Sequence, residues 1–201
     1  NYVEWINIIT SEMIPQRALL LGFPLTVLIV LQLYSWWQKR FADVAWWKIV
    51  LLGWLSGWLL FVHAHSFIAL FMVSGVLSLS RWRSWRQWLG YALATGSVAI
   101  PIAYLLHSSH LGSMFTWLPG WFAHPSEHGI SWFYFWWVNY GLFLPLAIWG
   151  TWQAKLWQHP LVISGWVIFL ALNLIEFQPH VWDNTKMLTW AHLFLVFPVM
   201  K

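Results

Sequence analysis

Long apolar runs, separated by short polar segments, follow one another along the chain from Ala18 onward. A bilayer offers no water to backbone groups, so apolar runs that enter it must be helical. The predicted spans are 18–37, 45–62, 66–79, 88–106, 131–149 and 161–177, and a seventh begins near Leu188. The pattern therefore predicts an all-α integral membrane protein, a polytopic helix bundle of about six to seven transmembrane helices.

The second and third runs are separated only by His63-Ala64-His65. Together they are too long for one span of roughly 20 residues and too short for two. We therefore expect a hairpin of two short or tilted helices over 45–79, with the histidines at its tip. In such a turn both rings could point into one cavity. The alternative is that one histidine caps a helix end while the other meets lipid headgroups.

The composition agrees with a membrane location. The 201 residues are 60% hydrophobic and 8% charged, whereas about a quarter of the residues in a soluble domain are charged. This balance excludes an ordinary cytoplasmic enzyme and a disordered chain. The ten basic residues are too few and too scattered to form a nucleic-acid-binding surface. Cysteine is absent, which excludes disulfides and thiolate metal sites.

The basic residues predict an orientation. If the spans alternate in direction, eight of the ten basic residues fall on one side of the membrane: Lys39, Arg40, Lys48, Arg81, Arg83, Arg86, Lys155 and Lys201. Such a bias is typical of the cytoplasmic side. Merging the 45–79 hairpin into one span would move the Arg81 cluster to the other side. We therefore expect a bacterial inner (cytoplasmic) membrane protein.

The 21 tryptophans are mostly explained by the same layout, because amphipathic rings are enriched at membrane interfaces. The inner interface is predicted to hold Trp36, Trp37, Trp46, Trp47, Trp82, Trp85, Trp88 and Trp157, and the outer one Trp117, Trp121, Trp132 and Trp182. Gly53 and Gly57 form a GxxxG motif, which predicts a close-packing face on the second helix.

Most residues capable of acid–base, metal or phosphate chemistry are predicted to face the non-cytoplasmic side. They are His63, His65, His107, His110, His124, His128, His180, His192, Glu12, Glu127, Glu176, Asp183, Arg17 and Lys186. Ionisable groups near spans are costly and therefore suggest function. His107 and His110 are three residues apart, which puts them on one helix face and would suit a divalent metal ion. Two solvated loop histidines are the more common outcome of that spacing.

Two further polar groups are candidates for substrate binding. Arg17, at the mouth of the first helix, could grip a phosphate with its bidentate fork or serve as an interfacial anchor. Glu176 precedes a polar edge formed by Asp183, Asn184 and Lys186. In the alternative, Asp183 or Asn184 caps the last helix and Lys186 lies in its first turn. We expect outer loops at 107–130 and 178–187.

The domain organisation expected is a single transmembrane domain over 1–201. The last apolar run, Leu188–Met200, is about 13 residues, shorter than the roughly 20 of a full span. We therefore expect the chain to be a piece of a longer protein. The alternative is a natural chain with an interfacial segment at each end.

Four segments, in order, resemble the later transmembrane part of bacterial membrane glycosyltransferases of the GT-C type. They are 14–25 with Ile14-Pro15-Gln16-Arg17, 63–67 with His63-Ala64-His65, 135–146 with Asn139-Tyr140-Gly141, and 177–186 with Asp183-Asn184-Thr185-Lys186. The resemblance covers nearly the whole chain but only a portion of such an enzyme. The acidic residue that acts as catalytic base in the family lies in the first outer loop, and we expect this chain to start after that loop, so the catalytic residue is not assigned.

The resemblance implies transfer of a sugar from a polyprenyl-phosphate donor on the non-cytoplasmic side, sometimes with a divalent metal ion. This chain would form the donor-side wall: Arg17 for phosphate, His63 and His65 lining the cavity, and Asp183, Asn184 and Lys186 at its edge. Two alternatives stay open. One is a non-catalytic transmembrane subunit of a larger complex, with other membrane subunits as partners. The other is a haem- or pigment-binding membrane subunit.

Overall fold

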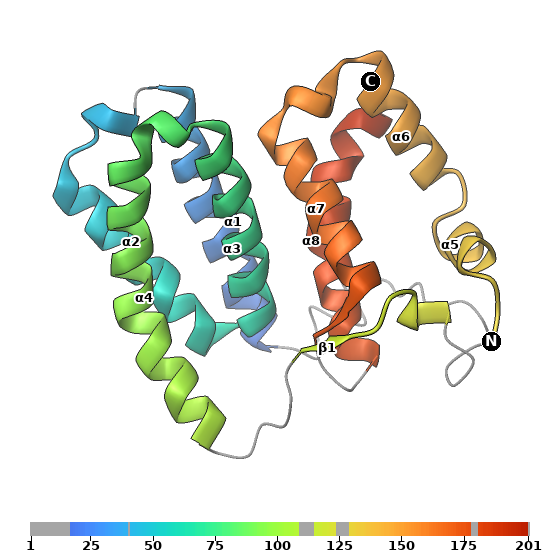
Figure 1. The fold of residues 1–201 in the computed structure, drawn as a ribbon, viewed down its shortest axis with the longest axis horizontal. Helices are drawn as coiled ribbons and strands as arrows, with labels where there is room; N and C mark the ends of the chain where they lie inside the picture. Colours follow the sequence, from blue (N-terminus) through green and yellow to red (C-terminus); the bar gives the residue numbers. More distant parts are fainter. Residues whose placement is uncertain (1–16, 40, 109–114, 124–128, 178–180, 201) are drawn as a thin grey trace. The chain divides into compact units, whose positions relative to one another are not determined.

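The computed structural model describes residues 17–39, 41–108, 115–123, 129–177 and 181–200. Within these ranges the protein is all-α, with eight α-helices, four short 3-10 turns and one ladder of two-residue strands (Figure 1). The helices form two compact units, an amino-terminal unit within residues 13–112 and a carboxy-terminal unit that contains residues 113–201. Each unit is described by itself.

The amino-terminal unit consists of helices α1 (Arg17–Gln38), α2 (Trp46–Val62), α3 (Ala64–Ser80) and α4 (Trp85–Ser108). The turn η2 (Phe41–Asp43) joins α1 to α2, and the turn η3 (Trp82–Ser84) joins α3 to α4. Helix α2 packs against the other three helices, most extensively against α4. The predicted apolar runs 18–37, 45–62, 66–79 and 88–106 are therefore confirmed as helices, within a few residues at each end.

Close approach of α2 to α4 depends on the two glycines of the GxxxG motif. A Cβ atom added at Gly53 would lie 2.6 Å from the Cβ of Ala94, and one added at Gly57 would lie 2.6 Å from the carbonyl oxygen of Thr95. Real Cβ atoms essentially never approach that closely, so these positions admit only glycine without movement of α4. The predicted close-packing face on the second helix is confirmed.

The carboxy-terminal unit contains α5 (Trp132–Tyr140), α6 (Phe143–Gln153), α7 (Pro160–Leu174) and α8 (Val181–Val199). The turn η4 (Trp121–Ala123) precedes α5, and the turn η5 (Leu156–Gln158) precedes α7. Strands β1 (Thr116–Trp117) and β2 (Ile175–Glu176) pair antiparallel, with Thr116 opposite Glu176. Helix α8 packs against α7 and α6.

Three boundaries in this unit differ from the sequence prediction. The expected span 131–149 is two helices, because Gly141 adopts φ = 50° and ends α5 at Tyr140. The expected helix 161–177 ends at Leu174, where the chain enters β2. Helix α8 begins at Val181, several residues before Leu188, so most of the segment 178–187 that we expected to be a loop is helical. An apolar run does not mark this part of α8, because the segment is polar, and the sequence pattern therefore did not predict a helix there.

Two helices in the described part of the chain are long and apolar enough to cross a membrane, Ala18–Gln38 and Trp82–Leu106. Three further apolar helices are shorter: Trp46–Val62, Ala64–Ser80 and Pro160–Leu174. Length and composition alone therefore give two candidate spans, fewer than the six to seven expected.

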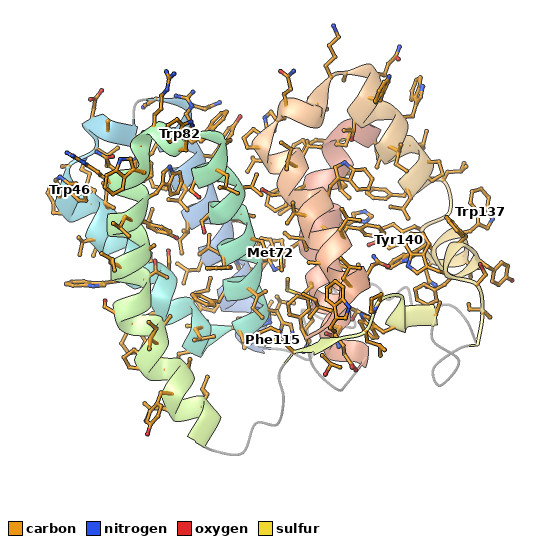
Figure 2. All side chains as sticks on the ribbon, in the orientation of Figure 1. Trp46, Met72, Trp82, Phe115, Trp137 and Tyr140 are labelled. Carbon is orange, nitrogen blue, oxygen red and sulfur yellow. The ribbon has the colours of Figure 1, made fainter. Side chains whose placement is uncertain are left out.

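The tryptophans divide into exposed and buried sets. Trp46, Trp47, Trp82 and Trp85 are more than half exposed, as an interfacial location requires. Figure 2 shows Trp46 where α2 begins and Trp82 just after α3 ends, the region that also carries Arg81. Three others that were assigned to the interfaces do not expose their rings. Trp36, Trp88 and Trp121 are buried among other side chains of the protein.

Candidate functional site

The histidine pair at the α2–α3 junction is the best-defined polar cluster that the sequence predicted. Helix α2 ends at Val62, and His63 has extended backbone angles (φ = −160°, ψ = 99°) before α3 begins at Ala64. The ring centroids of His63 and His65 lie 5.5 Å apart at an interplanar angle of 45°. Both residues are buried, at 7% and 6% exposed. The predicted hairpin and the proximity of its two histidines are confirmed.

His63 is the N-cap of α3. Its Nδ1 accepts a hydrogen bond from the backbone N–H of Ser66 at 3.2 Å and lies 2.7 Å from the Ser66 hydroxyl oxygen. A backbone N–H can only donate, so Nδ1 is the acceptor and the proton of the neutral ring is on Nε2. This confirms that one histidine caps a helix end. The second half of that alternative is wrong, because His65 is buried and not placed among lipid headgroups.

Helix α1 packs against the histidine pair. Gly22 faces His63 so closely that a Cβ atom added to the glycine would lie 2.5 Å from the histidine Cβ. The absence of a side chain at Gly22 therefore lets α1 reach the α2–α3 junction. Arg17 begins the same helix, but its side chain is outside the described part of the structure, so its expected phosphate contact stays a prediction.

The second predicted polar group lies in the carboxy-terminal unit. Glu176 is in β2, partly exposed, and pairs through its backbone with Thr116. Asn184 is fully buried in α8, and its Oδ1 accepts a hydrogen bond of 2.8 Å from the backbone N–H of Phe177. Asn184 therefore fixes the chain between β2 and α8 instead of capping the helix. The cap predicted for Asp183 is not tested, because the side chain of Asp183 is outside the described residues.

Lys186 lies inside α8, beyond its first turn, and is only 8% exposed. A lysine withdrawn from solvent needs a compensating partner, and side-chain or backbone oxygens of the protein or of a ligand are the usual ones. The predicted site residues thus form two groups, one in each unit: His63 and His65, and Glu176, Asn184 and Lys186. Their meeting in one cavity stays a prediction.

Within the ranges that the structure describes, no three His, Asp or Glu side chains gather as ligands would. His110 and the side chain of His107 lie outside those ranges, as do His124, Glu127 and His128. The metal site predicted at His107 and His110 stays a prediction.

Sequence reasoning missed a polar centre on α7. Asn173 is 5% exposed, and its Oδ1 accepts hydrogen bonds of 2.7 Å from the indole N–H groups of Trp132 and Trp136. Its Nδ2 donates to the carbonyl oxygen of Phe169 at 2.8 Å. An asparagine within an apolar helix was the available signal, since buried polar groups in proteins are hydrogen-bonded. This centre fastens α5 to α7.

His192 was also misplaced by the late start expected for the last helix. It lies well inside α8, and its ring stacks on Phe143 of α6 with centroids 4.0 Å apart and an interplanar angle of 11°. The ring centroid of Tyr140, which Figure 2 labels at the end of α5, lies 5.8 Å from that of the same imidazole. A histidine in the interior of a helix was therefore not recognisable from the predicted spans.

Comparison with protein-family models, with curated proteins and with solved structures finds no match to this chain.

Proposed function

We propose that this chain is a polytopic membrane protein that takes part in sugar transfer from a lipid-linked phosphate donor on the non-cytoplasmic side. The observation that carries the proposal is that, in the amino-terminal unit, the basic side chains and the histidine pair lie at opposite helix ends. Lys39, Lys48, Arg81, Arg83 and Arg86 all belong to the ends of helices joined by η2 and η3. The buried His63–His65 pair belongs to the opposite helix ends.

Helix lengths support several crossings by this unit. Helices α2 and α3 have 17 residues each, which at 1.5 Å per residue gives about 26 Å and meets the lower limit for a span. The flanks of these helices are apolar where they are exposed, as at Trp54, Trp58 and Phe71. A surface of this kind is compatible with lipid and unfavourable in water.

The positive-inside rule sets the orientation in this proposal. The basic helix ends face the cytoplasm, and the histidine pair faces the other side. There the Nε2–H of His63 and the ring of His65 are the groups proposed to contact sugar hydroxyls or phosphate oxygens. Arg17, at the start of α1 in the same unit, supplies the positive charge expected around a phosphate. In the carboxy-terminal unit, Lys186 is a second cation, and Asp183 is a carboxylate suited to accept hydrogen bonds from sugar hydroxyls. The sugar chemistry itself rests on the four segments that resemble GT-C enzymes.

The cysteine-free sequence allows a direct test of topology. Single cysteines introduced by Ala64→Cys and by Arg83→Cys are labelled in intact cells with a membrane-impermeant maleimide. We expect labelling of the cysteine at 64 from outside, after partial opening with low denaturant, because Ala64 is only partly exposed between two buried histidines. We expect labelling of the cysteine at 83 only after lysis. Equal labelling of both in intact cells would refute the orientation.

Activity is tested by transfer of radiolabelled sugar from a polyprenyl-phosphate donor in membranes that contain the full natural protein. Arg17→Ala and Asp183→Ala are each expected to abolish transfer, and Arg86→Ala, at the opposite helix ends, is the control. Unchanged turnover in both variants would remove these residues from the mechanism. Absence of turnover in the unaltered protein would favour the non-catalytic subunit, and a Soret band in its absorption spectrum would favour the haem-binding alternative.

A further inference from the structure

An apolar groove runs along α3 and α4 on the surface of the amino-terminal unit. Its volume is about 560 Å³, and its floor is formed by Ser56 and Leu60 of α2. It extends from residue 67 to 78 on α3 and from 88 to 103 on α4. At 1.5 Å per residue these stretches are about 16 Å and 22 Å long. That length compares with about 15 Å for the apolar depth of one leaflet.

Small side chains keep this groove open, and helix packing does not require them. A Cβ atom added at Gly75 would meet no atom within 4 Å, and one at Gly96 would make only an ordinary contact with Ile100. These two glycines differ from Gly53 and Gly57, whose positions are filled by α4. The Tyr91 hydroxyl donates to Ser56 at 2.7 Å and so leaves the floor without a free polar group at that point.

A second, polar hollow lies beside one end of the groove. It has a volume of about 680 Å³ and is lined by the η2 turn, which includes Asp43, and by Ser80, Arg81, Arg83 and Ser84. The two hollows adjoin each other, because Phe41, which lines the polar hollow, contacts the ring of Trp88, which lines the groove, at a centroid distance of 4.5 Å.

Hydrogen bonds and ring contacts fix the rim of the polar hollow. The indole N–H of Trp37 donates to the Ser80 hydroxyl at 2.8 Å, and the Arg81 guanidinium lies 4.8 Å from the centroid of the Trp37 ring. Gln87 donates to the carbonyl oxygen of Ala42 at 3.4 Å and so ties η2 to α4. The rim is thus preorganised and carries two guanidinium groups against the single carboxylate of Asp43.

We propose that an anionic phospholipid of the cytoplasmic leaflet binds here, with one acyl chain in the groove and its phosphate at Arg81 and Arg83. The groove has the polarity and length of an acyl chain, and the hollow at its end has the charge that complements a phosphate.

The phosphate end of this site lies at the helix ends opposite the His63–His65 pair, and the groove reaches Leu60 and Phe67 toward that pair. The inference rests on the membrane location in the proposed function and does not depend on sugar transfer. Trp82 and Trp85, both exposed beside the hollow, are placed as interfacial anchors at headgroup depth. Bound lipid would fill the gap between α3 and α4, which otherwise contact each other little within the unit.

The test is native mass spectrometry of the purified full chain, delipidated in detergent and titrated with dioleoylphosphatidylglycerol or with dioleoylphosphatidylcholine. We expect preferential retention of the phosphatidylglycerol. Arg83→Gln should weaken that retention about five-fold, as ~1 kcal/mol per basic residue near the headgroup implies. Arg86→Gln, whose side chain lies over Trp85 and does not line the hollow, is the matched control.

The groove is tested by Gly75→Leu, which should lower retention of both lipids at least five-fold by occupying the space of the acyl chain. Leu79→Phe, on the exposed side of the same helix, is the control. Because a Cβ at Gly75 meets open space, helicity in circular dichroism should be unchanged. Equal retention of the two lipids, or unchanged retention in both Arg83→Gln and Gly75→Leu, would overturn the proposal. The cysteine-labelling and transfer experiments are unaffected by that result.

Discussion

Replacing Asn173 by leucine tests the polar centre between α5 and α7. Leucine has a similar volume but no polar atom, so the two indole N–H groups lose their shared acceptor and the Phe169 carbonyl oxygen loses a donor. Trp136 is 3% exposed and cannot turn to solvent, whereas Trp132 is partly exposed. The variant therefore leaves one fully buried donor and one half-buried donor unpaired.

The free energy of unfolding should fall by about 2 kcal/mol. A buried, unpaired donor costs about 1–3 kcal/mol. Hydrogen bonds between helices in a bilayer average only about 0.6 kcal/mol, since the unfolded chain in the membrane also finds partners. The expected loss is thus set mainly by Trp136, with a smaller part from Trp132.

The measurement is unfolding by sodium dodecyl sulfate in mixed micelles, followed by tryptophan fluorescence. A double-mutant cycle with Trp136→Phe separates the hydrogen bond from general loss of packing. If the bond is real, Trp136→Phe costs less in the Asn173→Leu background than in the unaltered protein, by at least 0.6 kcal/mol. Strict additivity of the two substitutions would refute the reasoning.

The remaining predictions concern backbone positions and one histidine. Gly57→Leu should disrupt the α2–α4 contact at Thr95 and lower the unfolding free energy by more than about 3 kcal/mol, the upper range for overpacking. Gly75→Ala should be neutral or stabilising by up to about 1 kcal/mol. Both variants are compared with the unaltered protein by detergent unfolding. Gly141→Ala should cost about 1–3 kcal/mol in the same assay, because φ = 50° with ψ = −127° is strained for any residue with a Cβ; a gain in stability would contradict this. Burial lowers the pKa of His159, which precedes α7, below its usual 6.5. The unfolded chain therefore takes up the proton first, and stability falls as the pH drops below about 6.5, a dependence that His159→Gln should reduce.

The presence of helices in this protein follows from the sequence, because a long apolar run that enters lipid must form a helix to pair its backbone groups. The runs from 18 to 106 gave helix limits within a few residues of α1 to α4. The same reasoning failed at 131–149, where a single glycine with positive φ divides the run. It failed again at α8, whose first two turns are polar and were therefore interpreted as loop.

The candidate site was predictable only where neighbours in sequence are neighbours in space. His63 and His65 are two residues apart in a junction, so their proximity followed from the hairpin. Asn173 meets Trp132 and Trp136 across about 40 positions of sequence, and no local pattern indicates that contact. For the same reason Trp121, expected at a membrane interface, proved to donate to the Leu172 carbonyl oxygen inside the unit.

The sequence by itself determined an all-α chain with apolar helix flanks and a separation of basic from histidine-bearing helix ends. These properties depend on composition and on spacing along the chain. Tertiary structure alone decided which glycines are filled by a neighbouring helix and which leave open space. Gly53 and Gly57 allow α4 to approach, while Gly75 and Gly96 leave a groove. The physical reason is that the role of a missing side chain depends on what lies opposite it, and that is fixed only when the helices pack.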